Sequence, residues 1–311
     1  MPKRVTQTAS STETLGTEPG ARGAVLRCRA DGAVRGERLV FSTGLWTGEF
    51  DGQIDGLRCA RPDRLVSMDG FDPAASFGPV VAGSYDEHLR GDEGDAVGFL
   101  AELAQGGSAL ELAIGTGRIA LPLAACGVSV DGIELSAAMV DRLRMKPGGA
   151  ELDVTMGDMS VVATGRRYSV VYLVFNTIFN LLTADDQVRC FENAARHLAG
   201  GGCFVVETAV PSAWVTPERP EYVHAERIHL NEIVLDVARY DPVSQLLEEN
   251  HVRLATDGIT MSPIVCRLIT PGEMDLMARI AGLQIIERFA NWRREPFTAD
   301  SRAHVSIYRT R

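Results

Sequence analysis

The stretch that decides the fold is ALELAIGTGRIALPLA, residues 109–124. Its first residues are apolar apart from Glu111 and predict a buried strand, and the residues from 118 onward predict a helix. Between them, Ala113, Gly115 and Gly117 form a turn with almost no side chain. Glycines at such a turn let the backbone approach a ligand, and the N-terminus of the following helix faces that ligand. The stretch therefore predicts a nucleotide-binding turn.

Strands and helices alternate after this turn. Apolar runs at 128–135, 151–158, 168–175 and 203–210 predict four further strands, with helices between several of them. Ser136 is expected to be the N-cap of a helix over 137–144, after the second strand. A helix over 271–281, with Thr270 as its N-cap, and two strands at 283–289 and 304–309 follow later. Alternating units of this length require a parallel sheet with right-handed crossovers. The predicted fold class is α/β, with a doubly wound, mostly parallel, seven-stranded, Rossmann-like sheet.

The alternation breaks between residues 216 and 269. Three runs within 227–270 alternate between apolar and polar residues and are separated by DP and DG turns, which predicts an antiparallel β insertion. Residues 1–20 have almost no large apolar side chain and predict a disordered tail. We therefore expect the tail, an N-terminal extension of unknown fold over 21–83, a ligand-binding core over 84–215 and 270–311, and the insertion as a lid.

Composition excludes several classes of function. The 311 residues carry a net charge of −10, and no stretch is rich in Lys or Arg, so we expect no nucleic-acid partner. The apolar run 168–179 is too short for the roughly 20 residues of a membrane-spanning helix, and the N-terminus lacks an apolar signal segment. We therefore expect a cytoplasmic protein without a membrane partner. The six cysteines are far apart and lack nearby metal ligands, so no metal site is expected.

Acidic side chains follow the next two strands. Glu134 ends the second strand, where a carboxylate can accept hydrogen bonds from both hydroxyls of a ribose. Asp158 follows the third strand at the same edge, where an adenine would lie. A dinucleotide site prefers the motif G-x-G-x-x-G, but this chain has Ala120 at the third glycine position. Because Glu111 would repel a pyrophosphate and attract an amino group, the pattern favours S-adenosylmethionine.

With these motifs, residues 85–311 resemble class I S-adenosylmethionine-dependent methyltransferases. They are most similar to bacterial small-molecule enzymes such as the antibiotic-sugar N,N-dimethyltransferases. The resemblance implies S-adenosyl-L-methionine as cofactor and Tyr85 and Asn176 as catalytic residues. It implies cofactor contacts from Tyr85, Arg90, Glu111, Ala113, Gly115, Gly117, Glu134, Leu135, Asp158, Met159 and Asn176. Ala113 departs from the common first glycine, and nothing in the family pattern accounts for residues 1–80.

The sequence thus predicts a methyltransferase acting on a small-molecule acceptor, with natural-product biosynthesis among its expected roles. It leaves open whether the acceptor atom is nitrogen, oxygen or carbon, and which residue acts as a base. The insertion could also be a dimerisation surface, so a homodimer is allowed. Two alternatives remain: a catalytically silent nucleotide-binding regulator or scaffold, and a nicotinamide-dependent oxidoreductase.

Overall fold

The computed structural model describes residues 39–43, 46–50, 71, 73–87, 89–216 and 218–311. The chain divides into two compact units, residues 1–64 and 65–311. In the first unit, β1 (Leu39–Thr43) and β2 (Trp46–Phe50) pair antiparallel. The predicted tail, residues 1–20, and most of the predicted extension lie outside the described residues.

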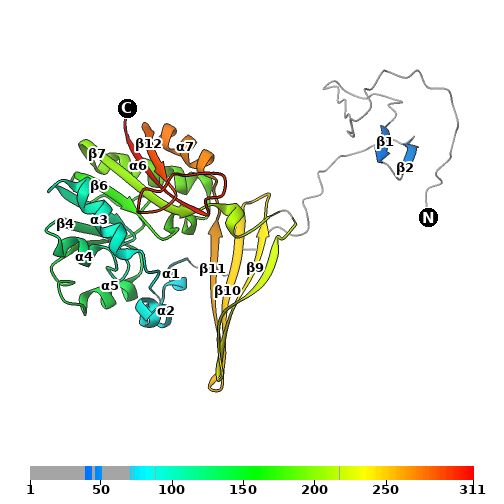
Figure 1. Cartoon of the computed structure of the whole chain (residues 1–311), viewed down its shortest axis with the longest axis horizontal. Coiled ribbons are helices and arrows are strands. Elements are labelled where there is room, and N and C mark those ends of the chain that lie inside the picture. Colours follow the sequence, from blue (N-terminus) through cyan, green and yellow to red (C-terminus); the bar gives the residue numbers. More distant parts are fainter. Residues whose placement is uncertain (1–38, 44–45, 51–70, 72, 88, 217) are drawn as a thin grey trace. The chain divides into compact units, whose positions relative to one another are not determined.

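The second unit is built on a seven-stranded sheet (Figure 1). In spatial order its strands are β12 (Leu283–Phe289), β13 (Ala303–Thr310), β7 (Leu198–Ala209), β6 (Tyr168–Leu173), β3 (Ser108–Leu112), β4 (Ser129–Glu134) and β5 (Asp153–Met156). The five strands from β7 to β5 pair in parallel, whereas β13 pairs antiparallel with both β7 and β12. The prediction of a mostly parallel, seven-stranded sheet is confirmed.

Helices cover both faces of this sheet. Alternate side chains of β6 point to opposite faces, as the pleat of a strand requires. Val170 and Tyr172 pack in a cluster with residues of α3 (Glu93–Ala104), α4 (Ala120–Ala125) and α5 (Ala137–Arg144). Val171 and Leu173 pack with residues of α6 (Ala184–His197) and α7 (Pro271–Ile280). The sheet is therefore doubly wound, as predicted.

Two predicted helix caps are present. The Ser136 hydroxyl accepts a hydrogen bond from the Met139 backbone N–H at 3.2 Å, at the start of α5. The Thr270 hydroxyl accepts one from the Glu273 N–H at 3.2 Å, at the start of α7. Each satisfies a backbone donor that has no partner within the helix.

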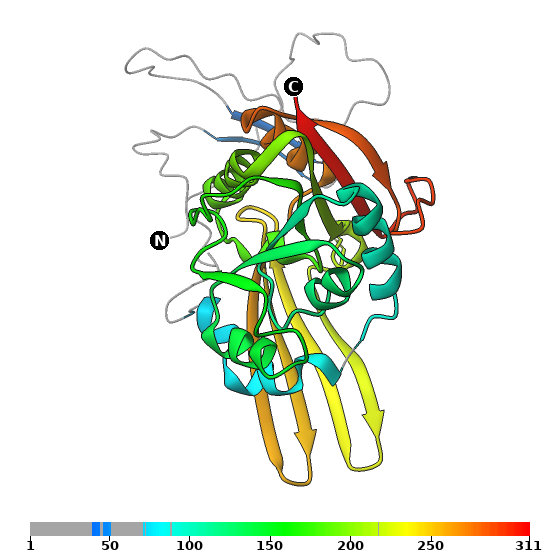
Figure 2. The same ribbon diagram turned by 90° about the vertical axis from the view of Figure 1, so that its left-hand side faces the viewer.

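The insertion forms a separate antiparallel sheet. Its strands are β8 (Glu221–His229), β9 (Glu232–Asp241), β10 (Leu246–Ala255) and β11 (Gly258–Arg267), in the order β11-β10-β9-β8. The prediction of three strands is wrong, because the first predicted run, which begins at residue 227, contains the end of β8 as well as β9. The two-residue turn that joins them, Leu230 and Asn231, has no glycine or proline to mark it. Figure 2 shows the two long hairpins projecting from the rest of the unit.

The segment before the core packs against it. It contains α1 (Pro73–Ser76), α2 (Pro79–Ser84) and the short 3-10 helix η1 (Tyr85–Glu87). The Ser76 hydroxyl donates to the Pro263 carbonyl at 3.1 Å, and the Ser136 hydroxyl donates to the Phe77 carbonyl at 2.7 Å. These helices therefore belong to the second unit, although the sequence suggested a boundary at residue 83. In the described part of the chain, no helix is both long enough and apolar enough to cross a membrane.

Candidate cofactor site

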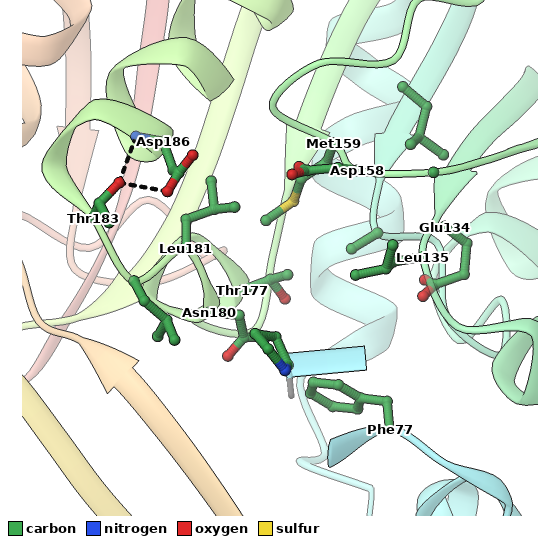
Figure 3. A pocket seen from close by; sticks show the side chains of 15 residues that line it. Phe77, Glu134, Leu135, Asp158, Met159, Thr177, Asn180, Leu181, Thr183 and Asp186 are labelled. Carbon is green, nitrogen blue, oxygen red and sulfur yellow. Dashed lines mark hydrogen bonds between the residues drawn. The ribbon is translucent and has the colours of Figure 1, made fainter. Parts of the chain in front are cut away.

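A cavity of about 350 Å³ opens where β3, β4 and β5 end at the carboxyl edge of the central sheet (Figure 3). Parallel α/β sheets bind their ligands at this edge. Five predicted site residues line the cavity: Ala113, Glu134, Leu135, Asp158 and Met159. They follow three strands that are neighbours in the sheet, so the structure brings together residues that the sequence only placed at separate strand ends.

Glu134 is the most constrained of these residues. Its Oε2 accepts a hydrogen bond from the Gly115 N–H, and its Oε1 accepts one from the Ser136 N–H, both at 2.8 Å. Burial raises the pKa of this carboxyl group, and the backbone donors oppose the shift. Each carboxylate oxygen has two acceptor positions, so one on each oxygen remains for a ligand. The side chain is thus held in place and can still accept two hydroxyl groups.

The turn after β3 adopts left-handed backbone conformations, with φ of 58° at Ala113, 57° at Gly115 and 77° at Gly117. Gly117 has the positive φ that favours glycine, and a Cβ there would lie 2.3 Å from Leu143 Cδ1, so the buried Leu143 side chain would have to move to make room for it. Ala113 adopts a left-handed conformation that costs less conformational energy for glycine than for alanine, which explains why glycine is expected at this first position of the turn. The turn is therefore specified by backbone conformation and by packing against α5.

Glu111 is buried beneath the turn and is not among the residues that line the cavity. Its Oε2 accepts a hydrogen bond from the Tyr172 hydroxyl at 3.0 Å. Burial raises the pKa of Glu111 to about 8, with a smaller contribution from the negative charge of Glu134. A cation placed nearby would favour the ionised form and lower that pKa.

The structure assigns protein partners to two predicted site residues, Arg90 and Asn176. Both terminal nitrogens of Arg90 contact the carboxylate of buried Glu207, at 3.1 and 2.6 Å. The Asn176 Oδ1 accepts a hydrogen bond from the Ala209 N–H at 2.6 Å. Neither residue lines the cavity. Both side chains fix the end of β7, an arrangement that sequence spacing does not reveal.

Tyr85 lies beside a cation that the sequence did not single out. The guanidinium of Arg118 lies 4.4 Å from the centre of the Tyr85 ring and 5.2 Å from that of Phe175. Arg118 Nη2 also donates to the Tyr85 carbonyl at 2.7 Å. Burial raises the pKa of the Tyr85 hydroxyl, Arg118 opposes this, and Glu111 adds to it. In the sequence, only the position of Arg118 directly after Gly117 indicated that it would lie near the site and contact Tyr85.

The sequence also missed much of the cavity wall. Phe77 comes from the segment before the core, and its ring centre lies 6.4 Å from that of Tyr85. The segment between β6 and α6 contributes Thr177, Asn180, Leu181, Leu182 and Thr183, and the first turn of α6 contributes Asp186. This segment follows a predicted strand and could have been placed at the same edge. Nothing in the sequence pointed to Phe77, because its approach depends on the bond between the Phe77 carbonyl and Ser136.

One group of possible metal ligands lies outside the cavity. Among the described residues, ligand atoms of Glu226, Asp236 and His251 come within 4.8 Å of one another. His251 Nδ1 lies 2.7 Å from Asp236 Oδ1, and this hydrogen bond raises the pKa of the imidazole. An ion pair between protonated His251 and Asp236 explains why these three side chains lie close together.

Comparisons with known proteins agree with this geometry. The family described as "Methyltransferase domain" matches residues 109–202. The solved CcbJ methyltransferase from Streptomyces caelestis is 37% identical, with a TM-score of 0.73, and the match covers 77% of this chain and 99% of that one.

Two curated relatives match more weakly. A cypemycin N-terminal methyltransferase from Streptomyces sp is 24% identical over 202 residues, which are 65% of this chain and 82% of the relative. A dTDP-3-amino-3,6-dideoxy-alpha-D-glucopyranose N,N-dimethyltransferase from Streptomyces fradiae is 32% identical over 163 residues. That match covers 49% of this chain and 61% of the relative. Because the chain has this core and glycine turn and matches 99% of the length of a methyltransferase that is 37% identical, it belongs to the S-adenosylmethionine-dependent methyltransferases.

Proposed function

We propose that this methyltransferase transfers a methyl group to the nitrogen of a small-molecule amine. The observation that carries the cofactor half of the proposal is the cavity at three neighbouring strand ends. In it, Glu134 would bind both ribose hydroxyls, and Leu135, Asp158 and Met159 would surround the adenine. The free acceptor positions of Glu134 and the mainly apolar lining fit an adenosyl group.

The methionine end of the cofactor would lie toward Tyr85, Glu111, Gly115, Gly117 and Asn176, with Arg90 supporting that side through Glu207. S-adenosylmethionine, when bound, supplies a methyl group on a positively charged sulfur. The protein's task is then to align the acceptor with that methyl group and to exclude water. A positively charged amino group next to Glu111 would favour the ionised form of this buried carboxyl group.

The acceptor half of the proposal rests on the inserted sheet. The Sγ of Cys266 in β11 lies 3.8 Å from the Oδ1 of Asn180. Asn180 in turn lines the cavity. Glu249 Oε1 accepts a hydrogen bond from the Tyr222 hydroxyl at 2.9 Å, and burial raises the Glu249 pKa. In the strand register Glu249 is opposite Ile264 and Leu247 is opposite Cys266, so Glu249 and Cys266 are diagonal neighbours on one face of the inserted sheet. We propose that Glu249 holds the acceptor amine and takes its proton.

Two relatives support nitrogen as the acceptor atom. Their names describe an N-terminal methyltransferase and an N,N-dimethyltransferase of an amino sugar nucleotide. Within this proposal, residues 216–269 act as the acceptor lid, and Tyr85 and Asn176 position the reactants. The proposal further includes a role in natural-product biosynthesis, a homodimer, and no nucleic-acid partner.

Calorimetric titration tests the cofactor half. S-adenosylhomocysteine should bind with micromolar affinity, while NAD at the same concentration should give no heat. Transfer is then assayed by mass spectrometry with amino sugar nucleotides, amino-terminal peptides and matched hydroxyl compounds. Methylation confined to the hydroxyl compounds would refute nitrogen as the acceptor, and heat with NAD but not with S-adenosylhomocysteine would refute the cofactor assignment.

A further inference from the structure

Polar side chains from three parts of the fold meet where the inserted sheet joins the core. The two hairpins project from this end (Figure 2), and β11 ends here at Arg267. The cluster consists of Gln187 of α6, Gln245 of the turn between β9 and β10, Arg267, and Glu273 of α7. We call these four side chains the joint. The joint connects the inserted sheet to two helices that cover the central sheet.

Arg267 is the centre of the joint and is 7% exposed. Its guanidinium donates hydrogen bonds to Gln187 Oε1 at 2.5 Å, to Glu273 Oε1 at 2.8 Å and to Gln245 Oε1. Gln245 Nε2 also donates to Glu273 Oε2 at 3.0 Å. A buried cation requires such partners, and the planar guanidinium fixes their directions. The end of β11 is therefore held at a defined angle to α6 and α7.

Gln187 makes the most specific contacts of the joint. Its side chain is fully buried, and its Oε1 accepts from Arg267. Its Nε2 donates to the carbonyl of Ile178 and to the carbonyl of Arg267, both at 3.1 Å. The oxygen thus faces a donor and the nitrogen faces two acceptors, which is the pattern that an amide satisfies. A carboxylate at this position would place an oxygen against both carbonyls.

These contacts reach the wall of the cofactor cavity. Ile178 belongs to the short 3-10 helix η2 (Thr177–Asn180), and its neighbours Thr177 and Asn180 line the cavity. Asn180 also contacts Cys266, the residue before Arg267. One buried amide therefore bonds both the cavity wall and the last residue of the inserted sheet. The cofactor assignment and the proposed base, Glu249, use neither Gln187 nor Arg267.

The angle of the sheet determines where Glu249 lies. Glu249 is opposite Ile264, three residues along β11 from Arg267, which is roughly 10 Å at about 3.3 Å per residue. Turning the sheet at the joint by about 6° would move Glu249 by roughly 1 Å, and such a misplacement can cost about a hundredfold in rate. The Ser76 hydroxyl also bonds the Pro263 carbonyl on β11, but this bond is exposed to water, which competes for it.

We propose that Gln187 and Arg267 are positioning residues for methyl transfer. The joint sets the angle between the inserted sheet and the cofactor cavity, and this angle aligns the amine bound by Glu249 with the methyl group to be transferred. The inference rests on the proposed function and deepens it, because it adds the residues that align the two halves of the site.

Gln187→Glu tests the angle directly, since it keeps the acceptor for Arg267 but loses both donors. Nitroxide labels on Leu230→Cys, at a fully exposed turn, and on Met145→Cys, 67% exposed after α5, report the distance from that turn to the core. Pulsed dipolar spectroscopy measures it in the full-length, unliganded chain, diluted with unlabelled protein, after three other cysteines are changed to Ser: Cys28, Cys59 and Cys126. Leu230 lies roughly 35 Å along β9 from the row of Arg267, so a turn of about 6° should shift or broaden the distance by roughly 4 Å.

Asn193→Asp is the matched control for a purely structural effect. Asn193 is also buried in α6, its Oδ1 accepts from Arg196, and its Nδ2 donates to the carbonyls of Met159 and Val162. The control therefore loses the same two donors without touching the inserted sheet. It should lower the unfolding midpoint about as much as Gln187→Glu does, and it should leave the label distance unchanged.

Activity supplies the second measurement. At saturating amine and cofactor, Gln187→Glu should lower kcat at least tenfold, while the Kd for S-adenosylhomocysteine should change less than about threefold. If Gln187→Glu does not fold, Gln245→Asn takes its place, because Asn tolerates the left-handed φ of 62° and is too short to reach Arg267. It should change the label distance and kcat in the same directions.

The outcomes separate this inference from the proposed function. An unchanged label distance, or an unchanged kcat, in the folded variant would overturn the positioning role. If the wild type methylates only hydroxyl compounds while Gln187→Glu still changes the label distance, the proposed function is wrong and the joint still sets the angle of the sheet.

Discussion

Replacing Glu134 by Gln tests two roles of its carboxylate: accepting backbone hydrogen bonds that stabilise the fold, and binding the ribose of the cofactor. In the wild type each oxygen accepts a backbone N–H at 2.8 Å. Glutamine has one acceptor oxygen and one NH₂ group, so one of the two backbone donors, Gly115 or Ser136, would face another donor. Losing one hydrogen bond to a charged group costs about 1.5–3 kcal/mol. We expect the free energy of unfolding of the unliganded variant to fall by about that amount.

The same substitution weakens cofactor binding. If the remaining acceptor positions take the two ribose hydroxyls, the loss of one should raise the Kd for S-adenosylhomocysteine at least tenfold, or about 1.4 kcal/mol. Calorimetric titration measures the Kd and urea unfolding measures stability. Asp153→Asn, on the exposed edge strand β5, removes a carboxylate of the same sheet and should change neither quantity. A folded Glu134→Gln variant with wild-type affinity would refute the ribose role, and one with wild-type stability would refute the hydrogen-bond argument.

Three further substitutions test other features. Because burial raises the folded-state pKa of Glu111 from 4.5 to about 8, this group stabilises the fold below pH 4.5 and loses that contribution as the pH rises through 8. The unfolding free energy of the wild type should therefore fall relative to Glu111→Gln across that range, by at most about 1.4 kcal/mol per pH unit, and parallel profiles would contradict the burial argument. Gly117→Ala should lower the free energy of unfolding by about 2–4 kcal/mol, measured in urea, because the new methyl group crowds Leu143 and the residue has a left-handed φ. Gly127→Ala is the control: this residue has a φ of 89° and open space around it, so the loss should be only about 1–2 kcal/mol. Equal losses in the two variants would show that crowding against Leu143 contributes nothing. Glu249→Gln should reduce kcat for an amine acceptor at least tenfold with an unchanged Kd for S-adenosylhomocysteine, and an unchanged kcat would exclude Glu249 as the base.

Local signals in the sequence predicted local structure well. The caps at Ser136 and Thr270 were recognisable because the side chain and its backbone partner are three residues apart. The order of strands and helices followed from apolar patterns that each element carries by itself. The strand ends at Glu134 and Asp158 then placed both residues at one edge, as the structure shows.

Contacts between distant segments could not be predicted in this way. The pairing of Arg90 with Glu207 joins residues that are 117 positions apart, and a charged residue in a sequence does not name its partner. Phe77 reaches the cavity wall through the bond between its carbonyl and Ser136, which depends on the tertiary structure. The turn at Leu230 and Asn231 was missed because hairpins of long, regularly paired strands can form without glycine.

The connections of the inserted sheet make it suited to exchange between proteins. Glu221 at the start of β8 and Val265 near the end of β11 lie in one row across the sheet, with Arg239 and Glu248 between them. The chain therefore enters and leaves the sheet at the end nearest the core, and the turn at Leu230 and Asn231 lies at the opposite end. Recombination or engineering could replace residues 221–267 as one cassette without cutting any strand of the central sheet. If the inserted sheet selects the acceptor, as proposed above, exchanging this one contiguous segment should change the acceptor preference.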